Sequence, residues 1–124
     1  MSLAATRAYR KVCRTSASGR QIEAIAFAKA ARLLEDARQA SADPAALDEA
    51  LSFTHLIWTM VQAETTDPRS PHAPLLKSAL ISLSLFVDRK IDELKLGHAR
   101  APLAALIEIN RDMASGLFAT PKTN

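Results

Sequence analysis

The sequence has few cysteines and no long apolar runs, which disulfide-rich, membrane-spanning and exported small proteins require. Among its 124 residues there is one cysteine, Cys13, which excludes an internal disulfide and fits a reducing compartment. No apolar run approaches the roughly 18 residues that a membrane-spanning helix requires. The first residues, MSLAATRAYRK, contain no apolar stretch of signal-peptide length. We therefore expect a cytoplasmic protein that does not enter membranes.

Glycine and aromatic residues are also scarce, at three residues and 5% respectively, whereas Ala and Leu are abundant. Ala and Leu lose little conformational freedom in a helix, and few glycines leave few flexible turns. The length fits one domain, and 48% hydrophobic with 23% charged residues is a globular composition. The composition predicts a single all-α domain.

Four stretches have helical periodicity: residues 20–39, 44 to at least 63, 74–96 and 102–118. Their ends carry recognisable signals. Ser18 and Gln21 can form a capping box before the first helix, Pro44 suits the first position of the second, and Gly97 suits the C-cap of the third. We predict a small bundle of four main helices spanning residues 20–118, preceded by a basic arm or short helix over residues 1–19 and followed by a frayed tail over residues 119–124.

A strand is the competing interpretation for residues 81–87, where Ile81, Leu83, Leu85 and Val87 alternate with other residues. The helical stripe through the same segment covers about five turns, so helix is favoured. The stripes of the four helices predict the core as follows: Ala26, Ala30, Leu33, Leu34 and Ala37; Leu47, Leu51, Thr54, Trp58 and Val61; Leu76, Leu80, Leu83, Val87, Ile91 and Leu94; and Leu103, Leu106, Ile107, Asn110, Ala114 and Leu117.

The residue types that commonly carry out catalysis or bind metals are not clustered in this sequence. His55, His72 and His98 stand far apart, and Cys13 has neither a nearby His nor a second Cys at CxxC spacing. There is no phosphate-binding loop, nucleophile elbow or HExxH motif. The sequence predicts a protein that is not an enzyme and has no cofactor, metal or small-molecule substrate, with His55 as a structural imidazole beside the apolar stripe.

Basic residues are concentrated at the N-terminus. Arg7, Arg10, Lys11 and Arg14 share one face if the segment is helical, and no carboxylate occurs in residues 1–20. This basic face can meet RNA phosphates or an acidic protein surface, although no aromatic RNA-binding motif accompanies it. A flexible arm that only aids solubility is the alternative.

Two further features concern packing and partner binding. Asn110 is polar within an apolar stripe, so a buried position requires a hydrogen-bond partner on a neighbouring element. Ile81, Leu85 and Phe86 remain after the core stripe of their helix is assigned, and they either wrap the core or form an exposed patch for a partner.

Four segments resemble the FlaF family: Ala8-Tyr9, Leu56–Trp58, Ala79–Val87 and Ile107–Leu117. The resemblance covers nearly the whole chain, and its most distinctive part is the pattern INR-x-M-x-x-GL within the last segment. Two positions depart from the family pattern. His55 stands where Asn is expected, and residues 70–74 replace an expected Asn-x-Leu-Pro loop.

The resemblance implies a cytosolic, non-enzymatic regulator of flagellum biogenesis in alphaproteobacteria, which promotes flagellin synthesis and export by binding flagellin as a chaperone. Flagellin and an FlbT-like regulator are the implied partners. A bundle with a spare apolar face can receive an amphipathic flagellin helix, and the candidate contacts are Ile81, Leu85 and Phe86, with Trp58 as an aromatic anchor. Trp58 and Asn110 are more readily explained as residues that maintain the fold.

The alternative is a post-transcriptional regulator that acts with FlbT on flagellin mRNA, through RNA or protein contacts of the basic face at Arg7, Arg10, Lys11 and Arg14. RNA is the weaker of these expected partners. A structural adaptor that self-associates or binds FlbT alone is a third interpretation.

Overall fold

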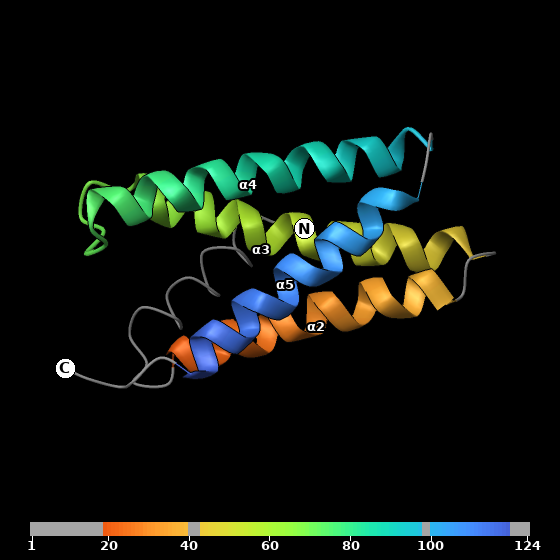
Figure 1. The fold of residues 1–124 in the computed structure, drawn as a ribbon, viewed down its shortest axis with the longest axis horizontal. Helices are drawn as coiled ribbons and strands as arrows, with labels where there is room; N and C mark the ends of the chain where they lie inside the picture. The colour runs from red at the N-terminus through yellow and green to blue at the C-terminus, as the bar shows by residue number, and fades with distance from the viewer. Residues whose placement is uncertain (1–18, 40–42, 98–99, 120–124) are drawn as a thin grey trace.

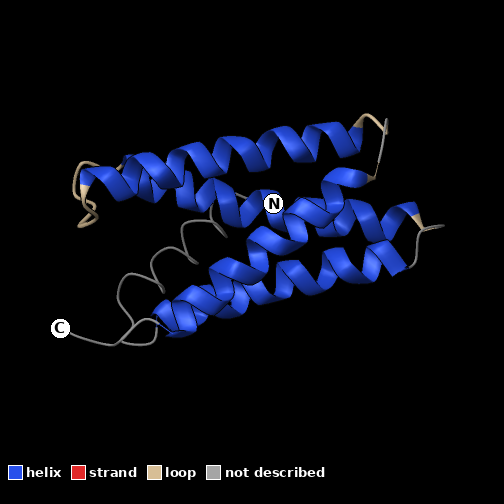
Figure 2. Cartoon of the chain, viewed as in Figure 1, coloured by secondary structure: helices blue, strands red, loops and turns tan. Residues whose placement is uncertain are grey.

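The structure, a computed structural model, describes residues 19–39, 43–97 and 100–119 (Figure 1). Within these ranges the chain forms four helices and no strand (Figure 2). The helices are α2 (Gly19–Gln39), α3 (Pro44–Thr66), α4 (Pro74–Lys95) and α5 (Ala101–Ala119). The predicted all-α bundle is confirmed, and the strand interpretation of residues 81–87 is wrong because that segment lies inside α4.

The helix ends follow the signals in the sequence. Asp43 caps α3, because its carboxylate accepts hydrogen bonds from the backbone N–H groups of Ala45 and Ala46, and Pro44 occupies the first turn. After α4 the backbone reaches a φ of 75° at Gly97, whose N–H donates to the carbonyl of Leu94 over 3.1 Å. Glycine adopts this left-handed conformation without the steric cost that a Cβ brings, which explains why α4 ends there.

The four helices run up and down, with each antiparallel to the next. Helix α2 packs against α3 and α5, while α4 packs mainly against α3 and less closely against α5. Figure 1 shows α4 near α5 where the two are joined in sequence and farther from it towards the start of α4. The N-terminal half of α4 therefore has a less covered position than the other helices.

Trp58 of α3 lies at the centre of the core with no exposed surface. Its ring meets the Phe27 ring of α2 edge to face, with centroids 5.4 Å apart. The indole Nε1 donates a 3.0 Å hydrogen bond to Oδ1 of Asn110 on α5, and Asn110 Nδ2 donates to the carbonyl of Leu106. Three helices thus meet at one aromatic residue, and the buried amide has the partner that its position in the stripe requires.

Most of the predicted core is confirmed, the side chain of Leu117 lies outside the described part of the structure, and two predictions are corrected. Val87, Ile91 and Leu94 are buried as predicted, but Leu76, at the start of the same stripe, is 46% exposed. The reason is that the first turns of α4 stand away from α5. The prediction for His55 is also wrong: its side chain is exposed on α3 and is not a buried structural imidazole.

A polar network crosses from α2 to α5 on the surface. Arg111 donates to Oε1 of Glu35 over 3.2 Å, and Arg38 donates to the other carboxylate oxygen over 2.8 Å. The hydrogen bond from Arg38 lowers the pKa of Glu35 below its ordinary value. On the other side of the bundle, Gln62 of α3 donates to Asp88 of α4 over 2.9 Å. These contacts link α2 to α5 and α3 to α4 at the surface.

Candidate protein-binding surfaces

The large apolar side chains that remain exposed are concentrated on α4. Among the described residues five such side chains are exposed, and four belong to α4 or its C-cap residue: Leu75 (84%), Leu76 (46%), Leu85 (50%) and Leu96 (69%). The fifth, Ile25, lies on α2 at 60%. Single exposed apolar residues are common in folded proteins, but several on one helix indicate a surface that another molecule covers.

Three of these leucines lie on one side of α4. Leu75, Leu85 and Leu96 are separated by ten and eleven residues, which is about three helical turns each time. Leu96 keeps helical backbone angles as the C-cap residue, so it continues the same line. Ile81, half-buried, lies one turn before Leu85. We call the set Leu75, Ile81, Leu85 and Leu96 the α4 stripe.

Small side chains separate Leu75 from Leu85, whereas Arg89 and Asp92, both exposed, lie between Leu85 and Leu96 on the same side. Ser78 and Ser82 are both exposed and lie between Leu75 and Leu85 on the same side. Small residues let a second helix approach closely, while the leucines on either side supply the apolar contact. The arrangement can therefore accept an amphipathic helix lying along α4.

The residues predicted as partner contacts are only partly brought together. Leu85 is exposed and Ile81 is half-buried, and both belong to the α4 stripe. Phe86 is half-buried on an adjacent side, where Arg89 and Lys90 lie 5.9 Å and 5.0 Å from its ring centroid. Sequence reasoning missed Leu75 and Leu96.

The prediction that Trp58 anchors a partner is corrected by its burial. A side chain with no exposed surface, whose polar atom is bonded to Asn110, offers nothing to a second molecule in this conformation. Trp58 therefore serves the fold, which is the interpretation that the sequence already favoured.

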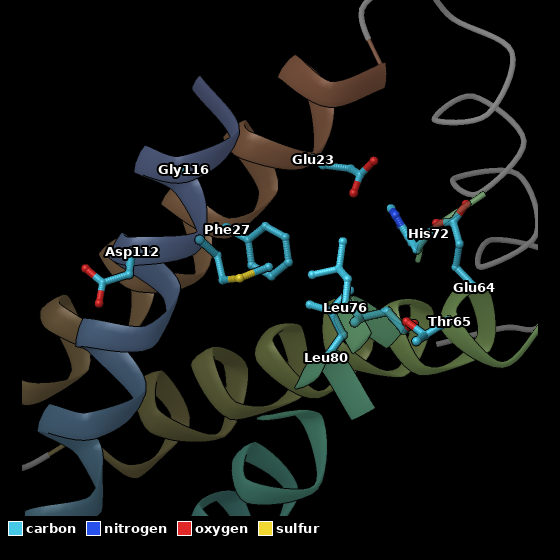
Figure 3. A pocket seen from close by; sticks show the side chains of 11 residues that line it. Glu23, Phe27, Glu64, Thr65, His72, Leu76, Leu80, Asp112 and Gly116 are labelled. Atoms are coloured by element: carbon cyan, nitrogen blue, oxygen red, sulfur yellow. The ribbon is translucent and has the colours of Figure 1, made fainter. Parts of the chain in front are cut away.

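A second surface is a groove of about 330 Å³ at one end of the bundle. It lies between the start of α2, the end of α3, the start of α4 and the end of α5 (Figure 3). We call it the end groove. Its lining is mostly apolar and consists of Phe27, Val61, Leu76, Leu80, Met113 and Gly116, with Glu23, Glu64, Thr65, His72 and Asp112 around them.

The side chains in the end groove have distinct orientations. Figure 3 shows Leu76 and Leu80 pointing from α4 into the space in front of Phe27. Glu23 and Glu64 stand at opposite sides of the opening, whereas the carboxylate of Asp112 points away from it. The end groove therefore has an apolar floor and two carboxylates at its rim.

The connection between α3 and α4 borders the end groove. Residues 67–73 contain Pro68 and Pro71, and Pro74 begins α4. This loop is longer than the connection of residues 40–43 between α2 and α3. Neither the loop length nor the periodicity reports how far the start of α4 lies from α5, which is the separation that opens the end groove.

Other predicted features lie outside the described residues. These are Cys13, His98 and the basic face at Arg7, Arg10, Lys11 and Arg14. Within the described ranges, no three His, Cys, Asp or Glu side chains are close enough together to hold a metal ion. Nor does any helix in this part of the chain have the length and apolar character needed to cross a membrane.

The described part of the chain defines a small all-α protein, in which four antiparallel helices form a bundle with an exposed apolar stripe and an end groove. The family model of the flagellar protein FlaF matches residues 5–117, so the chain belongs to the FlaF family. This is a family of flagellar proteins and not of enzymes. Comparison with curated proteins and with solved structures gives no match.

Two of the four segments that carry the family resemblance meet in the structure, whereas Ala8-Tyr9 lies outside the described residues. Trp58 of the Leu56–Trp58 segment is hydrogen-bonded to Asn110 of the Ile107–Leu117 segment. In that second segment Arg111 is paired with Glu35 of α2, and Met113 lines the end groove. The segment thus contributes to the core, to the surface contact with α2 and to the end groove.

Proposed function

We propose that this protein is a cytoplasmic flagellin-binding chaperone that promotes flagellin synthesis and export during flagellum biogenesis. Membership of the FlaF family supports a flagellar role. The observation that carries the binding proposal is the concentration of exposed leucines on one helix, at Leu75, Leu85 and Leu96. Such a surface is suited to an amphipathic helix of a protein partner.

The dimensions of the α4 stripe match a helical segment. From Leu75 to Leu96 it extends about 31 Å at the rise of an α-helix, which is the length of a partner helix of roughly 20 residues. A flagellin terminal segment that is disordered before assembly and amphipathic when folded fits this description. Covering its apolar side until export would keep it from aggregating.

The test is size-exclusion chromatography with light scattering of the full chain mixed with monomeric flagellin at moderate salt. The proposal predicts a stoichiometric complex that persists as salt is raised, because apolar burial is only weakly screened by ions. Two separate monomer peaks, with this protein folded by circular dichroism, would contradict it.

The second candidate is regulation of flagellin mRNA together with FlbT, through the basic face at Arg7, Arg10, Lys11 and Arg14. This candidate is favoured by the positive charge of residues 1–20, which contain no carboxylate. This candidate predicts RNA binding whose affinity falls steeply with salt, because phosphate contacts release counterions. A complex with FlbT alone, or self-association without flagellin, would instead indicate a structural adaptor.

A further inference from the structure

We propose that the end groove is the binding site for residues 1–18 of this same chain, with the apolar side of that segment on the groove floor and its basic residues at the rim. Three features support this: the opposite charges of the segment and the groove rim, the apolar residues of the segment, and the direct connection of the segment to α2. This assignment is independent of the flagellin proposal, since it requires no partner.

Charge complementarity is the first argument. Glu23 and Glu64 flank the opening of the end groove. Residues 1–18 contain the basic face at Arg7, Arg10, Lys11 and Arg14, and the first carboxylate of the chain is Glu23 itself. Long arginine and lysine side chains can lie over an apolar contact and reach carboxylates at its edge.

The pattern of apolar residues is the second argument. With helical periodicity, Ala5, Ala8, Tyr9 and Val12 fall on the side opposite the basic face. Tyr9 and Val12 are the two large side chains of that set. A groove of about 330 Å³ with a floor of Leu76, Leu80 and Phe27 has room for a few such side chains and not for a continuous row of leucines.

The connection to α2 is the third argument. Residue 18 precedes Gly19, the first residue of α2, and Glu23 on the following turn lines the end groove. The sequence at residues 16–19, SASG, consists of small residues that readily form turns, so the chain can reverse direction there. A short tether gives the segment an effective concentration in the millimolar range, so even a weak contact would be occupied.

If the N-terminal segment occupies the end groove, two separate surfaces of the bundle bind two different molecules or segments. The end groove receives the N-terminal segment of the same molecule, and the α4 stripe stays open for a second protein. Contact with the bundle would also draw the basic residues towards Glu23 and Glu64, which would reduce the charge available to RNA.

Hydrogen exchange measured by mass spectrometry on the full chain tests this assignment. Amides of residues 4–18 should exchange at least about tenfold more slowly than in an unstructured chain, since docking protects backbone hydrogen bonds. The neutralised variant Glu23→Gln/Glu64→Gln should raise their exchange rate severalfold. The matched control Asp36→Asn/Asp48→Asn makes the same change in net charge at the opposite end of the bundle and should leave the rate unchanged.

A second variant, Val12→Asp, alters the segment and leaves the bundle sequence intact, so it should release residues 4–18 while exchange in α5 stays slow. Exchange of residues 4–18 at the unstructured rate in the unaltered protein would overturn the proposal. So would protection that Glu23→Gln/Glu64→Gln does not change, because the segment would then bind elsewhere. Protection that disappears on dilution would assign the end groove to a second copy and would also overturn it.

Discussion

Replacing Trp58 with alanine is expected to lower the free energy of unfolding by about 3–5 kcal/mol. The indole has no exposed surface, contacts the Phe27 ring and is hydrogen-bonded to Asn110. Its removal would leave a cavity where α2, α3 and α5 meet and an amide oxygen without its partner. Urea unfolding followed by circular dichroism measures the loss, and a domain of this size has a total stability of roughly 5–15 kcal/mol.

The control Trp58→Phe separates packing from hydrogen bonding. Phenylalanine keeps an aromatic ring in the site but provides no N–H for Oδ1 of Asn110, so we expect a loss of about 1–3 kcal/mol. If Trp58→Ala costs less than Trp58→Phe, or less than about 1 kcal/mol, the indole is not the residue that joins the three helices.

The second large effect is expected on flagellin binding. The double variant Leu75→Asp/Leu85→Asp should weaken the complex by about a hundredfold, because each exposed leucine that is covered contributes roughly 1.5 kcal/mol and an aspartate there must lose water. Both side chains are exposed, so the fold should be unaffected. Isothermal titration of monomeric flagellin into the full chain gives the dissociation constants.

The control is Ile25→Asp, which replaces an exposed apolar residue of α2 by aspartate and adds one negative charge where the α4 double variant adds two. Ile25 lies outside the α4 stripe, so its replacement should change the dissociation constant by less than about threefold, a difference below 1 kcal/mol. Equal weakening by Ile25→Asp and by the α4 variant would mean that added negative charge, and not loss of the stripe, is responsible.

The helices were predictable because their ends are marked locally. Asp43 and Pro44 start α3 by satisfying or removing backbone donors, and Gly97 ends α4 because it accepts a positive φ. Asn110 was predictable as a bonded buried amide from its place in an apolar stripe. The sequence did not indicate that its partner on the neighbouring helix is the indole of Trp58.

What could not be predicted depends on distances between helices. Leu76 belongs to the same stripe as Leu94, yet it is half exposed, because only the C-terminal half of α4 is close to α5. Periodicity identifies a shared face and does not report how far that face lies from its neighbour. The end groove arises from this separation and was therefore missed.

The candidate contact surface was predicted in part for a similar reason. Leu85 was recognised as surplus to the core of its helix and is half exposed. Leu75 and Leu96 each stand within two residues of a predicted core leucine, and a sequence does not decide which of two neighbouring leucines faces outwards. The packing of α4 against α3 determines which of the two leucines is less exposed and which is more exposed.

The most direct test of the account is a map of backbone amide chemical shifts of the full chain, recorded before and after addition of monomeric flagellin. The account predicts that the largest shifts follow the α4 stripe, at Leu75, Ile81, Leu85 and Leu96, while the outer side of α2 around Ile25 stays unchanged. Shifts centred on α2, or no shifts at saturating flagellin, would contradict the claim that α4 is the surface that binds flagellin.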